Sequence, residues 1–321
     1  MTVTGSKTSL GIVGLGAYLP GEPVPNDSIA EGAGVELQWI HDRIGIEYRH
    51  HAAPEETTAD LAVRAAERAA EGSPVTPDMI VLATFTADRQ CPATAPFVQE
   101  RLGLTGVPAF DVDAACSGFV YALATATGLV HSGVSQTPLV IGADVFTRFI
   151  NPQDRRTAPL FGDGAGAVQL GPVPEGYGIL ATELWAEGTQ TSLAAVPRGG
   201  NWFVMDGRGV AGVVMEMGPK LLNTALAKAG VRLDQLNRVV VHQANPRLVR
   251  NLSEYVGLAD EVMPTYGKRT GNTASASVPV TLALAHEERP FRDGDLIALV
   301  AVGAGMTAGA VVLRWYEGPR A

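Results

Sequence analysis

The chain has 321 residues, 46% apolar and 18% charged, which permits one large domain or two of ordinary size. A formal charge of −9 without a basic stripe argues against a nucleic-acid partner. With two cysteines there is no disulfide framework, and no apolar stretch is long enough to span a membrane. We therefore expect a cytoplasmic protein with no export signal and no membrane contact.

Short apolar runs alternate with helical patterns along the chain. A helix is predicted over residues 58–71, followed by a strand at 79–83. A second long helix is predicted at 215–229. Further strands are predicted at 139–141, 239–241 and 296–302. Such apolar runs are typical of parallel strands buried on both faces, so the sequence predicts a layered α/β fold.

A faint internal repeat divides the chain. Residues 162–170 resemble residues 303–313, and each segment follows a predicted buried strand and a glycine loop. Further upstream, each has a helical pattern opened by small residues. We therefore predict two similar halves, residues 1–174 and 175–321. The Gly- and Pro-rich stretch at 171–176 is interpreted as their linker.

The two cysteines have different contexts. Cys116 follows a short apolar run and precedes a helical pattern, which places it near a helix N-terminus. There the helix dipole and free N–H groups favour the thiolate, the reactive form. A buried structural thiol is the alternative, and the local context leaves it open. Cys91 lies where no helix obviously begins, and we expect it to be buried filler.

Two further motifs carry polar side chains beside small residues. His242 ends the predicted strand at 239–241, where α/β folds place ligands. Asn245 follows it, and Pro246 is suited to open a helix. Asn272 lies between Gly271 and a run of small residues. Taken singly, a core histidine and a turn or cap asparagine explain these positions equally well.

Taken in order, these motifs resemble the ketoacyl-acyl carrier protein synthase III family of the thiolase superfamily. The resemblance covers nearly the whole chain. Its motifs are Trp39-Ile40, Arg43-Ile44-Gly45-Ile46, Asp113-Ala114-Ala115-Cys116, Asp154-Arg155-Arg156-Thr157, Phe161-Gly162-Asp163-Gly164-Ala165-Gly166, His242-Gln243-Ala244-Asn245, Gly271-Asn272-Thr273 and Gly303-Ala304-Gly305. It implies a thiolase-like five-layer αβαβα fold made of two similar halves, usually as a homodimer.

The resemblance also implies a reaction. Cys116 takes an acyl group from coenzyme A, and a malonyl-acyl carrier protein then loses carbon dioxide and attacks the thioester. The product is a β-ketoacyl thioester for fatty acid or specialised polyketide biosynthesis. His242 and Asn272 donate hydrogen bonds where negative charge develops. The N–H groups of Cys116 and Ala304 form the oxyanion hole. The coenzyme A thioester is a substrate, and neither a metal nor a further cofactor is expected.

Further residues are assigned to binding by the same resemblance. Trp39 and Arg155 match the positions that sandwich the adenine of coenzyme A, and a flat ring suits both side chains. Arg43 and Asn245 are expected beside the same substrate. Without the family, a half-buried helix residue and a solvated charge would explain Trp39 and Arg155.

Separate residues are expected to bind the carrier protein and the acyl chain. Arg247 and Arg250 are expected to dock an acidic carrier protein, with Lys268 and Arg269 adding to the basic rim. Scattered surface charge is the alternative. The acyl pocket is expected to include three residues, Cys91, Phe203 and Met205.

Two departures from the family pattern concern substrate choice. Ala308 stands where typical members often carry Trp, and the segment 84–92 is unusual. In this family the latter region reaches across the dimer to the acyl pocket. The primer is therefore not expected to be simply acetyl.

Three other functions are weighed against condensation. Acyl transfer from Cys116 to a hydroxyl or amine is disfavoured by Asn272, since a carboxylate would better serve a base. A non-catalytic subunit is disfavoured by the intact set of Cys116, His242 and Asn272. A dinucleotide-binding fingerprint at residues 14–16 fails, because Leu19 replaces its third glycine.

Overall fold

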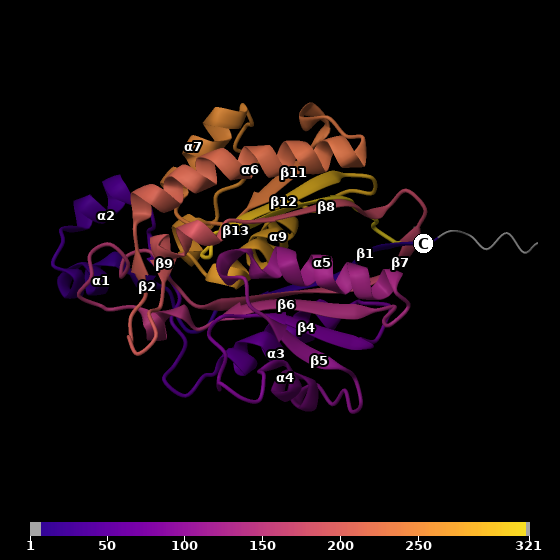
Figure 1. The fold of residues 1–321 in the computed structure, drawn as a ribbon, viewed down its shortest axis with the longest axis horizontal. Helices are drawn as coiled ribbons and strands as arrows, with labels where there is room; N and C mark the ends of the chain where they lie inside the picture. The colour runs from indigo at the N-terminus through magenta and orange to yellow at the C-terminus, as the bar shows by residue number, and fades with distance from the viewer. Residues whose placement is uncertain (1–7, 319–321) are drawn as a thin grey trace, which may run out of the picture.

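The computed structural model describes residues 8–318 and shows five layers (Figure 1). Two sheets enclose a central pair of helices, and further helices cover each sheet on its outer face. The layered α/β prediction is therefore confirmed. The covering and central helices are α3 (Thr58–Ala70), α4 (Ala95–Arg101), α5 (Gly118–His131), α6 (Gly207–Ala229), α7 (Pro246–Val256) and α9 (Ser277–Glu288).

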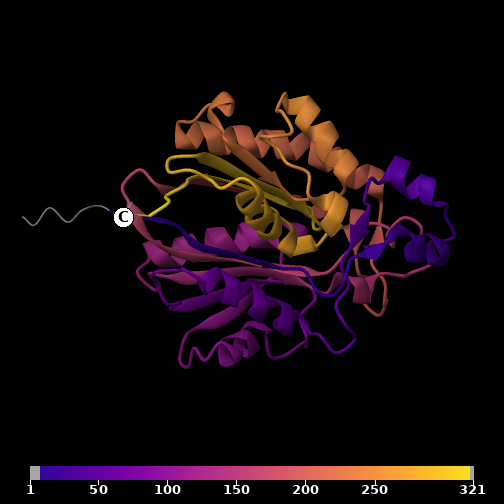
Figure 2. The same cartoon turned by 180° about the vertical axis from the view of Figure 1, so that it is seen from behind.

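The first sheet has five strands in the order β1-β7-β6-β4-β5. Strand β4 is parallel to β5 and β6, whereas β7 is antiparallel to both of its neighbours. Helices α3 and α4 cover its outer face, and α5 and α9 its inner face (Figures 1 and 2). The strands are β1 (Thr8–Tyr18), β4 (Met79–Ala83), β5 (Ala109–Val112), β6 (Pro138–Asp144) and β7 (Gly164–Pro174).

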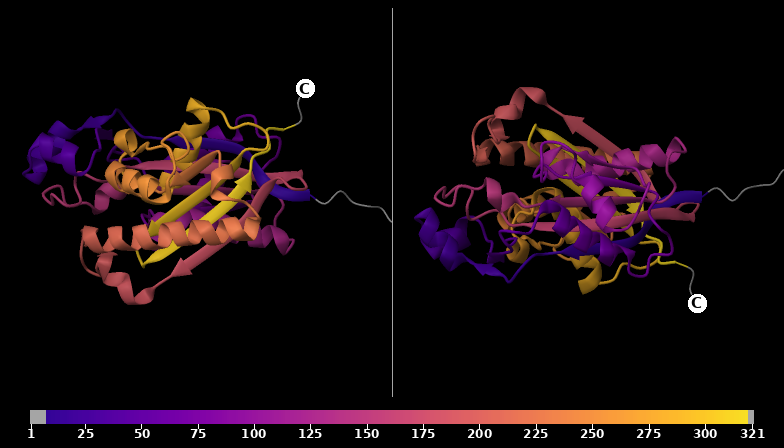
Figure 3. Two further views of the ribbon diagram at one scale, coloured as in Figure 1. Left: turned by 90° about the horizontal axis from the view of Figure 1, so that it is seen from above. Right: turned by 90° about the horizontal axis from the view of Figure 1, so that it is seen from below.

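The second sheet has four strands in the order β11-β12-β13-β8. Only β11 and β12 are parallel, so both sheets are mixed where parallel strands were expected. A three-residue turn joins β12 to β13, and a turn this short allows only antiparallel pairing. Figure 3 shows α6 crossing the outer face of this sheet. The strands are β8 (Gly178–Ala186), β11 (Arg238–Val241), β12 (Leu296–Gly303) and β13 (Thr307–Arg314).

Short elements gather at one end of the molecule, beyond the sheets (Figure 1). They include two small two-stranded ribbons and three short helices. Among them are β2 (Val24–Pro25), α1 (Asn26–Ala33), α2 (Leu37–Arg43), β3 (Tyr48–Arg49), β9 (Ala194–Ala195), β10 (Val204–Met205) and α8 (Gly267–Thr270). Many of the residues predicted to act on substrate lie on or beside these elements.

The predicted linker is wrong. Strand β7 continues through Pro174, and only residues 175–177 connect it to β8. Beyond Gln169, β7 pairs with β1 alone, so prolines without an N–H are tolerated there. Composition suggested a flexible joint, whereas the segment is the end of a strand.

Helix α6 begins at Gly207, well before the predicted start at residue 215. The Asp206 side chain caps it by accepting hydrogen bonds from the N–H groups of Arg208 and Gly209. Glycine is a poor helix former, so the glycine-rich first turns hid the helix from pattern analysis.

The two central helices begin in the same way. Ala115 and Ala274 have φ angles of 46° and 49°, an uncommon conformation for residues other than glycine. Each opens a 3₁₀ turn, Ala115–Ser117 (η1) and Ala274–Ala276 (η5), that leads into α5 and α9. Cys116 and Ser275 therefore occupy equivalent places in the two halves.

Candidate active site

Cys116 lies in η1, at the N-terminus of α5, as predicted. The end of β12 touches this turn. A Cβ atom added to Gly303 would lie 2.9 Å from the Cys116 nitrogen and 2.7 Å from that of Ser117. Glycine is therefore required at position 303 for close approach, and it brings the turn containing Ala304 beside the thiol.

The predicted thiolate is wrong for this state of the site. Burial, with a smaller contribution from the negative charge of Asp144, raises the pKa of the Cys116 thiol to about 12. The residue's own N–H donates to the sulfur and opposes these effects. Desolvation therefore outweighs the helix N-terminus, and Cys116 is a neutral thiol.

Two hydroxyl groups that the sequence analysis passed over fix this turn. Ser117 Oγ lies 2.8 Å from Thr307 Oγ1 and donates to the Ala114 carbonyl at 2.8 Å. Thr307 Oγ1 in turn donates to the Ala304 carbonyl at 2.9 Å. These contacts couple the Cys116 turn to the turn that carries Ala304.

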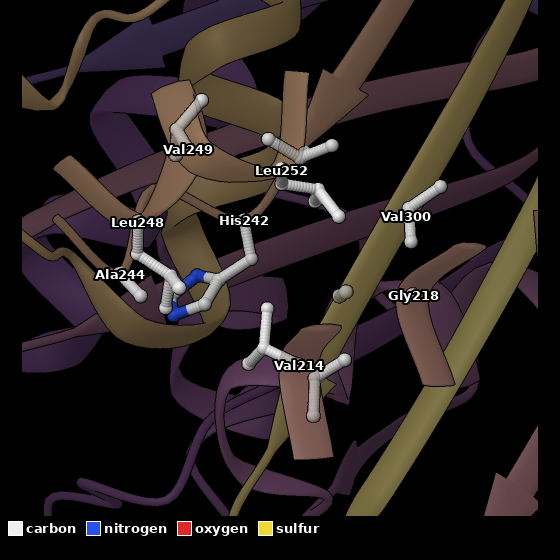
Figure 4. A pocket seen from close by; sticks show the side chains of 11 residues that line it. Val214, Gly218, His242, Ala244, Leu248, Val249, Leu252 and Val300 are labelled. Atoms are coloured by element: carbon white, nitrogen blue, oxygen red, sulfur yellow. The ribbon is translucent and has the colours of Figure 1, made fainter. Parts of the chain in front are cut away.

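His242 follows β11, and its N–H donates to the Val300 carbonyl at 2.8 Å. Within residues 8–318, its buried Nδ1 has no hydrogen-bond partner. Burial lowers the pKa of the imidazole to about 4, so the ring is neutral near pH 7 and carries one N–H donor. Figure 4 shows the ring in a small pocket whose wall includes Val214, Ala244 and Leu248.

Gln243, next to His242, holds the two C-terminal motifs together. Its N–H donates to Ser277 Oγ at 2.7 Å. Its side-chain oxygen accepts from the N–H groups of Tyr266 and Gly267, both at 3.0 Å. The only sequence signal for this role is a glutamine inside the His242 motif.

Asn272 is held by backbone and side chain. Its N–H donates to the Leu160 carbonyl at 2.8 Å, and its carbonyl accepts from Gly162 at 3.0 Å. Its Oδ1 accepts from the Ala274 N–H at 2.9 Å. Because the oxygen is engaged, the amide NH₂ is the end left to act as a donor.

Phe203 and Met205 pack in one apolar cluster with Cys116. The rings of Phe146 and Phe161 stack at 4.0 Å in the same cluster, and Phe203 meets both edge-on. Two predicted acyl-pocket residues therefore lie near the nucleophile. Cys91 is exposed on the loop between β4 and α4, so the expectation that it is buried filler is wrong, whereas its place in an acyl pocket across a dimer stays a prediction. Residues 89–92 of this loop are all exposed.

The predicted coenzyme A residues lie at the end that carries α2. The Arg155 guanidinium carbon lies over the Trp39 ring, 5.0 Å from its centroid. Arg43 is exposed at the end of α2. Asn245 caps α7, and its side-chain oxygen accepts from the Leu248 N–H at 2.8 Å.

Arg247 and Arg250 are both exposed on α7. Arg247 donates to the Asp42 carbonyl at 2.5 Å and so joins α7 to α2. Lys268 and Arg269 lie on α8, where Arg269 pairs with Glu288 at 2.9 Å. The predicted basic rim is thus partly engaged in contacts within the protein.

No group of His, Cys, Asp and Glu side chains in residues 8–318 could hold a metal ion. No helix there is long and apolar enough to cross a membrane.

Comparison with known proteins gives consistent matches. Sequence models for 3-oxoacyl-[acyl-carrier-protein (ACP)] synthase III and its C-terminal part match residues 110–188 and 226–315. A β-ketoacyl-[acyl-carrier-protein] synthase III from Streptomyces coelicolor is 41% identical, with 95% of this chain and 96% of the relative covered. The acetoacetyl CoA synthase NphT7 of a Streptomyces species is 40% identical, with 95% and 98% covered.

Solved structures agree with this match. A 3-oxoacyl-(acyl carrier protein) synthase III from Pseudomonas aeruginosa has a TM-score of 0.92 and 38% identity, covering 97% of this chain and 100% of that chain. The priming β-ketosynthase of the R1128 polyketide pathway has a TM-score of 0.90 and 30% identity, covering 99% and 100%.

Proposed function

Because the chain belongs to the 3-oxoacyl-[acyl-carrier-protein] synthase III family, we propose that it condenses an acyl-CoA primer with a malonyl-acyl carrier protein. Primer acylation comes first. Cys116 sulfur attacks the thioester carbonyl, coenzyme A leaves as a thiol, and the N–H groups of Cys116 and Ala304 stabilise the oxyanion. Since Cys116 is a neutral thiol, its proton must leave during attack; the neutral His242 imidazole is proposed to accept it and pass it to the departing coenzyme A sulfur.

Extension follows by decarboxylation. Loss of carbon dioxide from the malonyl thioester leaves an enolate, so no strong base is needed to form the carbanion. An N–H of His242 and the Asn272 NH₂ stabilise the enolate oxygen. The enolate carbon then attacks the acyl-Cys116 carbonyl, the C–S bond breaks, and a β-ketoacyl thioester leaves.

The orientation of Asn272 is the observation that carries this proposal. Its Oδ1 is occupied by the Ala274 N–H, so its donor end serves the substrate. A donor suits an enolate, whereas transfer of the acyl group to an alcohol or amine calls for a base. Incubation with acyl-CoA and malonyl-carrier protein should release carbon dioxide and give a β-ketoacyl product. Acyl loss to a small acceptor without malonyl thioester would contradict it.

Trp39 and Arg155 are proposed to hold the adenine of coenzyme A between them, with Arg43 near a phosphate and the Asn245 amide toward the same substrate. The position of the Arg155 guanidinium over the Trp39 ring supports this assignment, and the two side chains would have to separate to admit the base. The exposed Arg247 and Arg250 are proposed to meet the carrier protein. Coenzyme A enters as part of the substrate, and no further cofactor is invoked.

We also propose a cytoplasmic homodimer. All residues of the edge strand β5 are partly exposed, including Phe110 and Val112, and an apolar edge of this kind is commonly protected by pairing. In such a dimer, the exposed Cys91 loop is proposed to complete the partner's acyl pocket beside Phe203 and Met205. Light scattering should give twice the mass of the chain, and a monomer would contradict the proposal.

A further inference from the structure

A buried carboxylate outside the predicted catalytic set lies near enough to Cys116 to act on it through its charge. Asp144 ends β6 and is fully buried. Its Oδ1 accepts from Thr84 Oγ1 at 3.0 Å, from the Phe85 N–H at 3.1 Å, and from the Thr86 N–H and Oγ1 at 3.2 and 3.0 Å. Its Oδ2 accepts from the Ser275 N–H at 2.9 Å and from Ser275 Oγ at 2.5 Å. Both oxygens are therefore committed to neutral donors.

These donors come from both halves of the molecule. Residues 84–86 begin the loop that follows β4, whereas Ser275 lies in η5, at the place equivalent to Cys116. Ser275 Oγ also lies 2.9 Å from the Ala83 carbonyl. One side chain thus ties the start of the Cys91 loop to the turn that opens α9.

The first turn of α5 rests on this network. A Cβ atom added to Gly118 would lie 3.3 Å from the Cβ of Ala83 and 3.5 Å from that of Ser275. Gly118 is two residues beyond Cys116. Asp144 is also close enough for its charge to act on the Cys116 thiol. Any shift of Ser275 or Ala83 would therefore be felt by the turn that presents the nucleophile.

The same carboxylate places a wall of the apolar cluster around Cys116. With its N–H held by Asp144, Phe85 packs its ring against Phe146 at 4.6 Å and Phe149 at 5.7 Å. Phe85 and Cys116 contact the same buried cluster. A shift of this ring would therefore alter the apolar surroundings that Cys116 shares with it.

We propose that Asp144 is a positioning residue for condensation, which holds the Phe85 segment and the Ser275 turn in one arrangement and so fixes the acyl pocket relative to Cys116. This inference rests on the proposed function. An asparagine cannot replace the carboxylate, because its NH₂ would face N–H donors on one of the two sides.

Asp144→Asn tests the proposal against a matched variant. Asp78 directly precedes β4, at the opposite end of the same strands. It also accepts from a serine hydroxyl, that of Ser135, and from two N–H groups, those of Gln136 and Thr137. We expect Asp144→Asn to slow acylation of Cys116 at least about tenfold and to change the kcat/KM ratio of long to short acyl-CoA primers several-fold. Asp78 is half-buried, so Asp78→Asn should lower the melting temperature less, with the acylation rate and the primer ratio each within about twofold of wild type. Equal behaviour of the two variants would overturn the proposal.

Two further measurements keep every outcome decisive. Ser275→Ala removes only one contact to Oδ2, and it should shift the primer ratio in the same direction but less; an unchanged ratio contradicts the proposal even if Asp144→Asn does not fold. Alkylation of Cys116 by iodoacetamide needs no acyl substrate. If wild type accepts no acyl-CoA, the proposed function fails. Asp144→Asn should still change the alkylation rate several-fold relative to Asp78→Asn, and equal rates would reject the positioning role.

Discussion

At the level of single residues, the hydrogen bonds made within the protein decide which polar atoms of the site are left to bind substrate. Asn272 uses its oxygen within the protein and keeps its NH₂ for a substrate, and His242 is neutral with an unpartnered buried Nδ1 among the described residues. A neutral donor stabilises the negative charge that develops on the substrate, whereas a positively charged donor would also bind a permanent anion. These features account for the chemistry better than the presence of the residues alone.

Replacing Asn272 by Asp would set a carboxylate where the enolate forms. We expect decarboxylation to fall about 10²–10³-fold, the usual cost of losing one oxyanion donor. Acylation of Cys116, followed by intact mass, should persist within a few-fold. Asn237→Asp is the matched control, because its side-chain oxygen still accepts from the Leu296 N–H. Decarboxylation that survives Asn272→Asp would refute the donor role.

Trp39→Ala tests the adenine site. We expect KM for acyl-CoA to rise about tenfold, equivalent to about 1.4 kcal/mol, because a stacking face is lost. Turnover at saturation should change little. The acyl-pantetheine substrate lacks adenine, so its kinetics should be the same for both proteins. A matching loss with acyl-pantetheine would show that Trp39 acts otherwise.

Among elements, the β12–β13 turn and η1 must approach each other without side chains between them. Gly303→Ala would place a methyl group against the backbone nitrogens of Cys116 and Ser117, which cannot move aside easily. We expect acylation to fall at least about tenfold, together with a loss of stability of about 1–3 kcal/mol. The measurements are single-turnover acylation and urea unfolding.

Gly128→Ala is the control for that change. Gly128 lies in α5, is exposed, and has open space around an added Cβ. The substitution should stabilise the protein by about 0.5–1 kcal/mol and leave acylation unchanged. Equal acylation by the two variants would contradict the close-approach argument.

Elements were predictable where local pattern and tertiary role agree. The strand at 79–83 and the end of the helix at 229 lie as predicted, since apolar runs and a following glycine mark them. Residues 171–174 and 207–214 misled, because strand pairing and an Asp206 cap overrode unfavourable local composition. The Asp144 network left no sequence signal, since its donors are mostly backbone N–H and hydroxyl groups from distant segments.

At the scale of the whole molecule, the layered fold followed from alternating strands and helices. The five-layer arrangement followed from family resemblance and the faint repeat. The protonation state of Cys116 could not be predicted from the sequence. Motif position predicted a Cys116 thiolate, but burial between two sheets depends on packing that residues 113–118 alone do not reveal.

Buried histidines predict how the fold responds to acid. Burial lowers the pKa of His51 to about 4, helped by the charges of Arg49 and His50, and burial alone does the same for His242. The unfolded chain therefore binds protons more readily between about pH 6.5 and 4, and stability is lost as pH falls through that window. Asp144, whose pKa burial raises to about 6, acts in the opposite direction.

Urea unfolding between about pH 6.5 and 4 should show that the free energy of unfolding decreases as the pH is lowered. Each such histidine contributes up to about 1.4 kcal/mol per pH unit. His51→Gln should reduce the slope. His131→Gln, at an exposed position in α5, should leave it unchanged. An identical slope for wild type and His51→Gln would rule out His51 as a source.

The paired turns at Ala115 and Ala274 have a consequence for how this molecule can change. Each presents its next side chain from an uncommon backbone conformation, yet one offers a thiol to substrate and the other buries a hydroxyl against Asp144. The turn at Ala274 therefore supports the turn at Ala115. Replacing Ser275 by a cysteine would remove its hydroxyl contact to Asp144, and the turn that presents Cys116 would lose part of its support. We therefore expect that a second active thiol at position 275 would lower the reactivity of Cys116.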